Sequence, residues 1–324
     1  MKKTLILAFA LTILATFTGK QSIAQTKEEA GNAFNTALEL SKTDMAGAIV
    51  KMQDVIKMCS TVGKDADSLK MKVTKVLPSW QYNVGNSYIK DKKYDQAIAA
   101  FEKSDEFGMT YGDANIRQKS DEQLVKLYTN KGNILLKAEK ADSALIFFDK
   151  ALKMDPQYSK ALFATGQAYK KKGDNEKMTA NMELAITAAS KTNDTILIKA
   201  AKNMIGSNLN QEGLAAYNKK AYADAVTKLN QALTYGYKTK DLYYVLAVSN
   251  NSLKNYDAAI ECANLGLALD EQTNDKMARY YCEVAKAYEG KKDLPNACAN
   301  YKKAAFGSST QFSNDKLKNV LKCQ

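Results

Sequence analysis

The stretch from 125 to 158 reads VKLYTNKGNILLKAEKADSALIFFDKALKMDPQY, and it decides the fold. Gly132 and Ala144 lie twelve residues apart in it, a large side chain follows at Phe148, and a small one follows at Ala151. Because a helix turns every 3.6 residues, this spacing predicts two short helices that cross closely where neither carries a bulky side chain. One such pair cannot bury its own apolar face, so it needs neighbours to stack on.

The same spacing returns along the chain, which predicts a stack of such pairs. Gly166 keeps the twelve-residue register with Met178. Small residues fill both positions in four other places: Gly85 and Ala97, Gly213 and Ala225, Ala247 and Ala259, Ala285 and Ala297. Only 16 glycines and three prolines in 324 residues also favour helix throughout.

The pattern resembles the tetratricopeptide repeat, a helix-turn-helix unit of 34 residues. Tyr128, Gly132, Ala144, Phe148 and Pro156 fall at the family's characteristic positions in the quoted stretch. The resemblance implies an all-α fold, a right-handed α-solenoid of about seven repeats within residues 25–311. The units are expected near 27–62, 78–111, 125–158, 159–192, 206–239, 240–273 and 278–311.

Two inserts of thirteen residues, at about 112–124 and 193–205, interrupt the regular spacing. We interpret them as extensions that lengthen the first helix of the following unit. Ser68 to Leu77 looks like a third extension, and Pro78 is expected to start or kink the helix after it. Residues 312–324 are predicted to form a helix that caps the last apolar face.

Residues 1–24 have the pattern of a secretory signal peptide. Lys2 and Lys3 precede a short apolar run, and Ser22 and Ala24 provide the small residues of a cleavage site. This predicts export to the periplasm of a Gram-negative bacterium, with association with the envelope and an uncleaved anchor as alternatives. No later segment is apolar enough for a membrane span.

The composition argues against common enzyme chemistry. The chain has no histidine, which removes the Ser-His-Asp and Cys-His nucleophile systems and the commonest transition-metal ligand. We therefore expect no catalytic residues, no metal site and no cofactor. A histidine-free hydrolase with paired carboxylates is the less favoured alternative, since Asp105-Glu106 and Asp121-Glu122 lie near helix ends, where capping explains them.

The formal net charge is +12, and removing the leader with its three lysines and no acid leaves +9. The lysines are scattered at helix ends and turns, and export argues against nucleic acid as the partner.

Five cysteines show no spacing typical of a zinc site. Cys282 and Cys298 fall on the two helices of the last pair, and Cys323 lies on the segment after it. A disulfide among these, with Cys282 and Cys298 as the first candidates, would staple the last unit. Small buried thiols are the alternative.

In the tetratricopeptide family, the first helices of the units line a concave face that binds extended peptides or a partner's helix. The resemblance places these residues on that face: Tyr82, Asn86, Lys126, Asn130, Asn133, Lys137 and Lys160. The expected partner is a protein or peptide with an acidic or carboxylate-bearing segment.

Some family members clamp a peptide's C-terminal carboxylate at five positions. Asn86, Asn130 and Lys160 match three of these positions, whereas Tyr82 and Ala164 depart from the other two. A general polar and basic groove is therefore favoured over the clamp. The sequence predicts a non-enzymatic periplasmic scaffold, with a self-associating structural or envelope-assembly component as the alternative.

Overall fold

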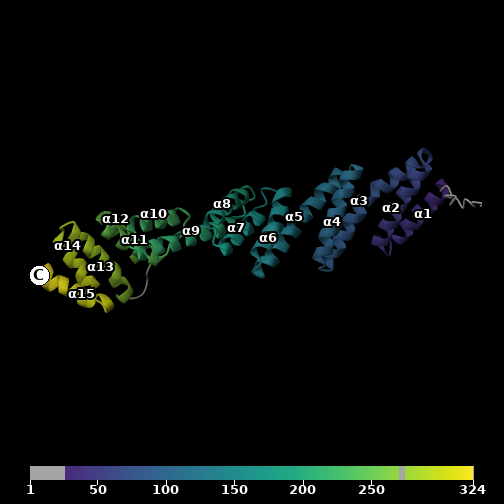
Figure 1. Ribbon diagram of the computed structural model, residues 1–324. Helices are drawn as coiled ribbons and strands as arrows, with labels where there is room; N and C mark the ends of the chain where they lie inside the picture. Colours follow the sequence, from purple (N-terminus) through teal and green to yellow (C-terminus); the bar gives the residue numbers. More distant parts are fainter. Residues whose placement is uncertain (1–25, 270–273, 324) are drawn as a thin grey trace, which may run out of the picture. The chain divides into compact units, whose positions relative to one another are not determined.

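The computed structural model describes residues 26–269 and 274–323, and every regular element in these ranges is a helix. The expected signal peptide, residues 1–24, lies outside the described residues. Consecutive helices joined by short turns form pairs, so the fold is an all-α solenoid of stacked helix pairs (Figure 1). The chain divides within α5 into two compact units, residues 1–123 and 124–324, and each is described by itself.

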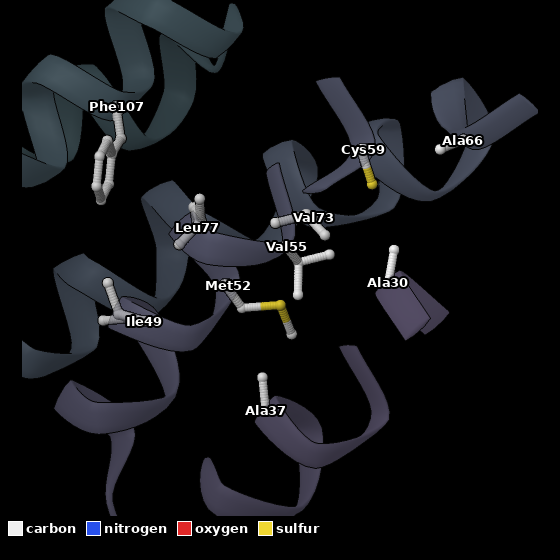
Figure 2. Packing of buried hydrophobic residues seen from close by; sticks show 10 residues of the cluster. All are labelled: Ala30, Ala37, Ile49, Met52, Val55, Cys59, Ala66, Val73, Leu77 and Phe107. Carbon is white, nitrogen blue, oxygen red and sulfur yellow. The ribbon is translucent and has the colours of Figure 1, made fainter. Parts of the chain in front are cut away.

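The first unit contains two helix pairs and the first part of α5. Its helices are α1 (Lys27–Leu40), α2 (Met45–Val62), α3 (Asp67–Lys90), α4 (Tyr94–Tyr111) and α5 (Ala114–Lys137). Figure 2 shows Met52 and Val55 of α2 directed between the helices that carry Ala37 and Val73. All four side chains are fully buried, so α2 is the centre of this core.

The second unit continues with further pairs and a terminal cap. Its helices are α6 (Ala141–Met154), α7 (Ser159–Lys172), α8 (Asn175–Lys191), α9 (Thr195–Asn218), α10 (Tyr222–Thr234), α11 (Lys240–Ser252), α12 (Tyr256–Ala268), α13 (Asn274–Gly290), α14 (Leu294–Ala304) and α15 (Thr310–Asp315).

Three helices that open a pair are unusually long. α3, α5 and α9 have 24 residues each, whereas α7 has 14 and α11 has 13. This confirms that the inserts extend first helices. The expected helix start at Pro78 is wrong, because α3 begins at Asp67 and runs through the proline. Leu77 and Pro78 are both buried, and the Ser104 hydroxyl of α4 donates to the Pro78 carbonyl at 2.9 Å, so packing outweighs the hydrogen bond that proline removes.

Glycines of the first helices make room for large side chains of the second helices. A methyl group on Gly85 would lie 2.8 Å from the Phe101 ring, and one on Gly213 would lie 2.7 Å from Leu229. Each glycine therefore faces the large residue sixteen positions later. Gly213 also approaches the small residue twelve positions later, because a methyl group on it would lie 3.4 Å from the Ala225 carbonyl oxygen. The predicted close crossing of the helices is thus confirmed there, and the packing of a large side chain against the glycine is an addition that the sequence did not predict.

The turn inside six pairs has its central residue at a φ between 60° and 74°. These residues are Lys92, Glu139, Gly173, Lys220, Lys254 and Lys292. The next residue donates back to the first helix, as Lys93 N–H does to the Tyr88 carbonyl at 2.8 Å. Gly173 is the one glycine of this set, and it alone adopts the left-handed conformation without a Cβ penalty.

α15 and the π-helical turn Lys316–Val320 cover the last pair (Figure 1). Leu317 and Leu321 pack against Tyr301 and Ala304 of α14. Lys316 Nζ reaches Glu289 Oε1 of α13 at 2.7 Å. This segment shields apolar residues of the pair formed by α13 and α14 from water.

A disulfide joins Cys298 of α14 to Cys323, with the Cα atoms 5.8 Å apart. The expected pairing of Cys282 with Cys298 is wrong, and Cys282 is a buried free thiol. Cys298 directly follows Ala297, which lies on the buried face of α14, so its side chain is turned about 100° away from that face. The bridge still staples the last pair, because Cys323 ends the segment that covers it.

None of the helices in the part of the chain that the structure describes has the length and apolar character to cross a bilayer.

Candidate binding groove

A hollow of about 900 Å³ lies in the second unit, between the first helices of consecutive pairs. Residues of α5, α7 and α9 line it, and second helices of the pairs do not contribute. We call this hollow the groove, and its lining residues are Asn133, Leu136, Lys137, Lys160, Phe163, Ala164, Gln167, Lys170, Lys171, Leu197 and Met204.

The floor of the groove is apolar and well supported. Leu136 and Ala164 are buried and belong to one core cluster. Phe163 and Met204 pack against the cluster that holds Met178 and Met182. Since these side chains are anchored in the core, the floor is a fixed surface on which an apolar side chain of a ligand can be buried.

The rim of the groove carries four lysines and no carboxylate. Lys171 Nζ pairs with Glu139 Oε1 at 2.5 Å. Lys137, Lys160 and Lys170 have no ion pair among the described residues. The groove therefore has uncompensated positive charge beside an apolar floor, which suits a ligand with acidic and apolar groups.

The structure brings three of the predicted binding residues together. Asn133, Lys137 and Lys160 all line the groove. Lys126 and Asn130 are exposed on the preceding turns of α5 and do not line it. The extended α5 presents only its last two turns to the groove, which is why its earlier polar residues lie outside.

Tyr82 and Asn86 belong to the first unit, on α3. The Tyr82 ring packs edge-on against Phe101, with ring centroids 5.2 Å apart, so it has a packing role. Asn86 is half-buried. The groove is thus described by residues of the second unit alone.

Sequence reasoning missed Leu197 and Met204 as groove residues. Both come from the first half of the long α9, which a repeat of ordinary length would not possess. The apolar spacing of the insert signalled a helix there. The spacing could not tell which face of that helix would turn towards α7.

The two acidic pairs considered as an alternative catalytic site, Asp105-Glu106 and Asp121-Glu122, lie on α4 and α5, where these helices pack together. Arg117 Nε lies 3.0 Å from Asp105 Oδ1. Burial raises the pKa of the Asp121 carboxyl, as does the nearby charge of Asp105, and Arg117 partly offsets both. Beside them the Ser120 hydroxyl donates to the Ser104 hydroxyl at 3.0 Å. This arrangement is that of an ion-paired helix contact rather than two carboxylates across a cleft.

Across the described residues, no three His, Cys, Asp or Glu side chains gather in a way that could hold a metal ion.

Family models for the tetratricopeptide repeat match residues 81–107, 125–158, 147–180 and 210–274. No curated protein matches the chain.

Among solved structures, the MamA protein is 21% identical with a TM-score of 0.35, over 61% of this chain and 96% of its own. YrrB, described as a TPR protein with an unusual peptide-binding site, is 17% identical with a TM-score of 0.34, over 60% of this chain and 88% of its own. A tetratricopeptide repeat protein from Parabacteroides merdae is 12% identical with a TM-score of 0.28, over 91% of this chain and 99% of its own. These likenesses concern the fold alone.

Proposed function

Because this chain belongs to the tetratricopeptide-repeat family, we propose that it is a non-catalytic scaffold that holds a segment of another protein in the groove. The segment carries acidic side chains next to apolar ones. The family supports a protein-binding or peptide-binding role, and the chemistry of the groove supports this particular class of ligand.

The observation that carries the proposal is the combination of an apolar floor and three rim lysines without an ion pair among the described residues. Burying one leucine-sized side chain on the floor contributes about 1.5–3 kcal/mol. Each exposed lysine–carboxylate pair contributes roughly 0.2–1 kcal/mol. The floor thus supplies much of the affinity, while Lys137, Lys160 and Lys170 select acidic ligands over basic ones.

We propose that this binding takes place in the periplasm, on the strength of the leader at residues 1–24. Cell fractionation and N-terminal sequencing test this point separately. Export predicts a mature chain that begins at Gln25 in the periplasmic fraction, and an intact Met1 in the cytoplasmic fraction would contradict it.

The groove is tested by fluorescence anisotropy with the labelled peptide EELEELLEE and its charge-swapped partner KKLKKLLKK. The acidic peptide is expected to bind, and binding should weaken as salt rises from 50 to 300 mM. The groove variant, Lys137→Glu with Lys160→Glu and Lys170→Glu, should bind it roughly tenfold or more weakly, because three attractive pairs become repulsive.

A matched control variant carries Lys219→Glu, Lys220→Glu and Lys254→Glu. These lysines are exposed on the same unit, outside the groove, and the charge change is identical. The control should bind EELEELLEE like the native protein. Equal binding by the groove variant and the native protein would overturn the proposal, as would equal affinity for KKLKKLLKK. If the molecular mass of the protein rises with its concentration and the larger species no longer binds EELEELLEE, self-association would be favoured instead.

A further inference from the structure

A second hollow, of about 530 Å³, lies in the same unit against the opposite side of the first turns of α9. We call it the outer hollow. Its walls are the start of α9 and the end of α10 with the turn after it, where Gly236 has a φ of 79°. Three lysines, Lys199, Lys202 and Lys238, line it, and no carboxylate does.

The lysines of the outer hollow have no direct carboxylate partner. Lys199, Lys202 and Lys238 form no ion pair in the part of the chain that the structure describes. Two carboxylates lie near the hollow and bind neutral groups: Glu183 Oε1 accepts from the Tyr235 hydroxyl at 2.6 Å, and Asp194 accepts from the Leu197 N–H at 3.0 Å. Both keep their negative charge, but three lysines against two such carboxylates leave the hollow with an excess of positive charge.

The groove and the outer hollow share the first turns of α9 as a common wall. Leu197 and Met204 line the groove, whereas Ile198, Lys199 and Lys202 line the outer hollow. Successive residues of a helix are turned by about 100°, so Leu197 and Met204 lie on one side of α9 and Lys199 and Lys202 on the other, with the exposed Ile196 between them on the solvent side. A chain that leaves the groove over this exposed side of α9 reaches the outer hollow.

We propose that the outer hollow binds the acidic continuation of the segment held in the groove, so that an acidic polypeptide crosses α9 and is contacted by both sets of lysines. The proposal rests on the function proposed for the groove. Charge complementarity selects an anionic occupant. A polypeptide fits better than a small anion, because the two hollows lie on either side of one helix and each also offers apolar contact, from Phe163 in one and Ile198 in the other.

The test compares two fluorescein-labelled peptides: EELEEL, of 6 residues, and the same sequence followed by twelve glutamates, of 18 residues. An extended chain spans about 3.3 Å per residue, so the longer probe extends about 40 Å further than the shorter one and can pass over α9, whose diameter with side chains is about 10–12 Å. The native protein should bind the 18-mer at least tenfold more tightly than the 6-mer. The outer variant, Lys199→Glu with Lys202→Glu and Lys238→Glu, should keep its affinity for the 6-mer and reduce that advantage below threefold.

The control variant at Lys219, Lys220 and Lys254 has the same net charge as the outer variant and should keep the full length advantage. Circular dichroism should show all variants folded, since these lysines are exposed or bound to no other group. A length advantage that survives in the outer variant, or that is lost equally in the control variant, would overturn the inference. Lysine-dependent binding to phosphatidylglycerol vesicles without any gain from the twelve added glutamates would also overturn it, by assigning the hollow to lipid.

The two proposals fail in different ways. If the groove proposal fails, the groove variant binds the 6-mer as well as the native protein does. If only the inference fails, the 6-mer depends on the groove lysines, and the 18-mer gains nothing from the outer ones.

Discussion

Replacing Gly85 by alanine should destabilise the first unit, although alanine is the better helix former. Gly85 lies inside α3, where alanine would gain about 1 kcal/mol in helix propensity. The added methyl group, however, would lie 2.8 Å from two carbons of the Phe101 ring. That ring is fully buried and packs edge-on against Tyr82, so it has no free space to retreat into.

Overpacking of this kind costs about 1–3 kcal/mol, and the net result should be a loss of up to about 2 kcal/mol. Gly31 of α1 provides the control, because a methyl group there would have no neighbour within 4 Å. Gly31→Ala should stabilise the same unit by about 0.5–1 kcal/mol. The two substitutions are chemically identical and should differ in sign.

Urea unfolding followed by tryptophan fluorescence is the appropriate assay. The chain has a single tryptophan, Trp80, which lies in α3 and packs against the core of the first unit. Its signal therefore reports the unit in which both glycines lie. The free energy of unfolding falls by about 1–3 kcal/mol per molar urea. The urea midpoints of Gly85→Ala and Gly31→Ala should therefore move in opposite directions from that of the native protein, by a few tenths of a molar or more.

A second substitution tests whether contact with Phe101 causes the loss of stability in Gly85→Ala. Phe101→Leu shortens the side chain that the methyl group would meet, so Gly85→Ala should cost less in that background. The coupling between the two changes should be about 1 kcal/mol or more. If Gly85→Ala stabilised the unit as much as Gly31→Ala does, the close approach that positions these helices would be refuted.

Four further predictions concern the second unit. Gly173→Ala should cost about 1 kcal/mol in a thermal melt, because it adds a Cβ at a φ of 74°. Replacing Cys298 and Cys323 together by serine should lower stability by about 3 kcal/mol, the value for a loop of this length, in chemical unfolding of the oxidised protein. The same double variant should also speed the reaction of the Cys282 thiol with Ellman's reagent, whereas an unchanged rate would show that the covering segment does not shield it. Burial raises the pKa of Cys282 to about 11 from its ordinary 9.0, so the folded state favours the protonated thiol. The contribution of the protonated Cys282 thiol to the free energy of unfolding is present in full below pH 9 and is lost as pH rises through 11. The melting temperature of the native protein should therefore fall over this window, and that of Cys282→Ala should fall less.

The helix pairs were predictable because their determinants are local. The Gly132 and Phe148 register lies within one repeat, and the long α5 and α9 follow from inserts that keep helical spacing. The place of Pro78 inside α3 was not predictable from the sequence, because the rule against proline inside helices concerns local hydrogen bonds. Burial of the residue between α3 and α4 decides its place instead.

The site was only half predictable, because lining residues depend on how neighbouring helices face each other. Asn133, Lys137 and Lys160 follow from repeat positions, whereas Leu197 and Met204 enter through the orientation of the α9 extension. The disulfide shows the same limit. Spacing placed Cys282 and Cys298 on paired helices, but one residue of helical rotation turns Cys298 towards the terminal segment.

The most direct test of the groove is methyl NMR of protein labelled at methionine methyl groups, titrated with EELEELLEE. Met204 lines the groove, whereas Met71 and Met109 are exposed on the first unit and are not among the residues that line it. Met204→Leu identifies the relevant resonance. The Met204 methyl signal should shift and saturate with the peptide, while those of Met71 and Met109 stay in place. Peptide binding that left the Met204 signal unmoved would contradict the groove proposal.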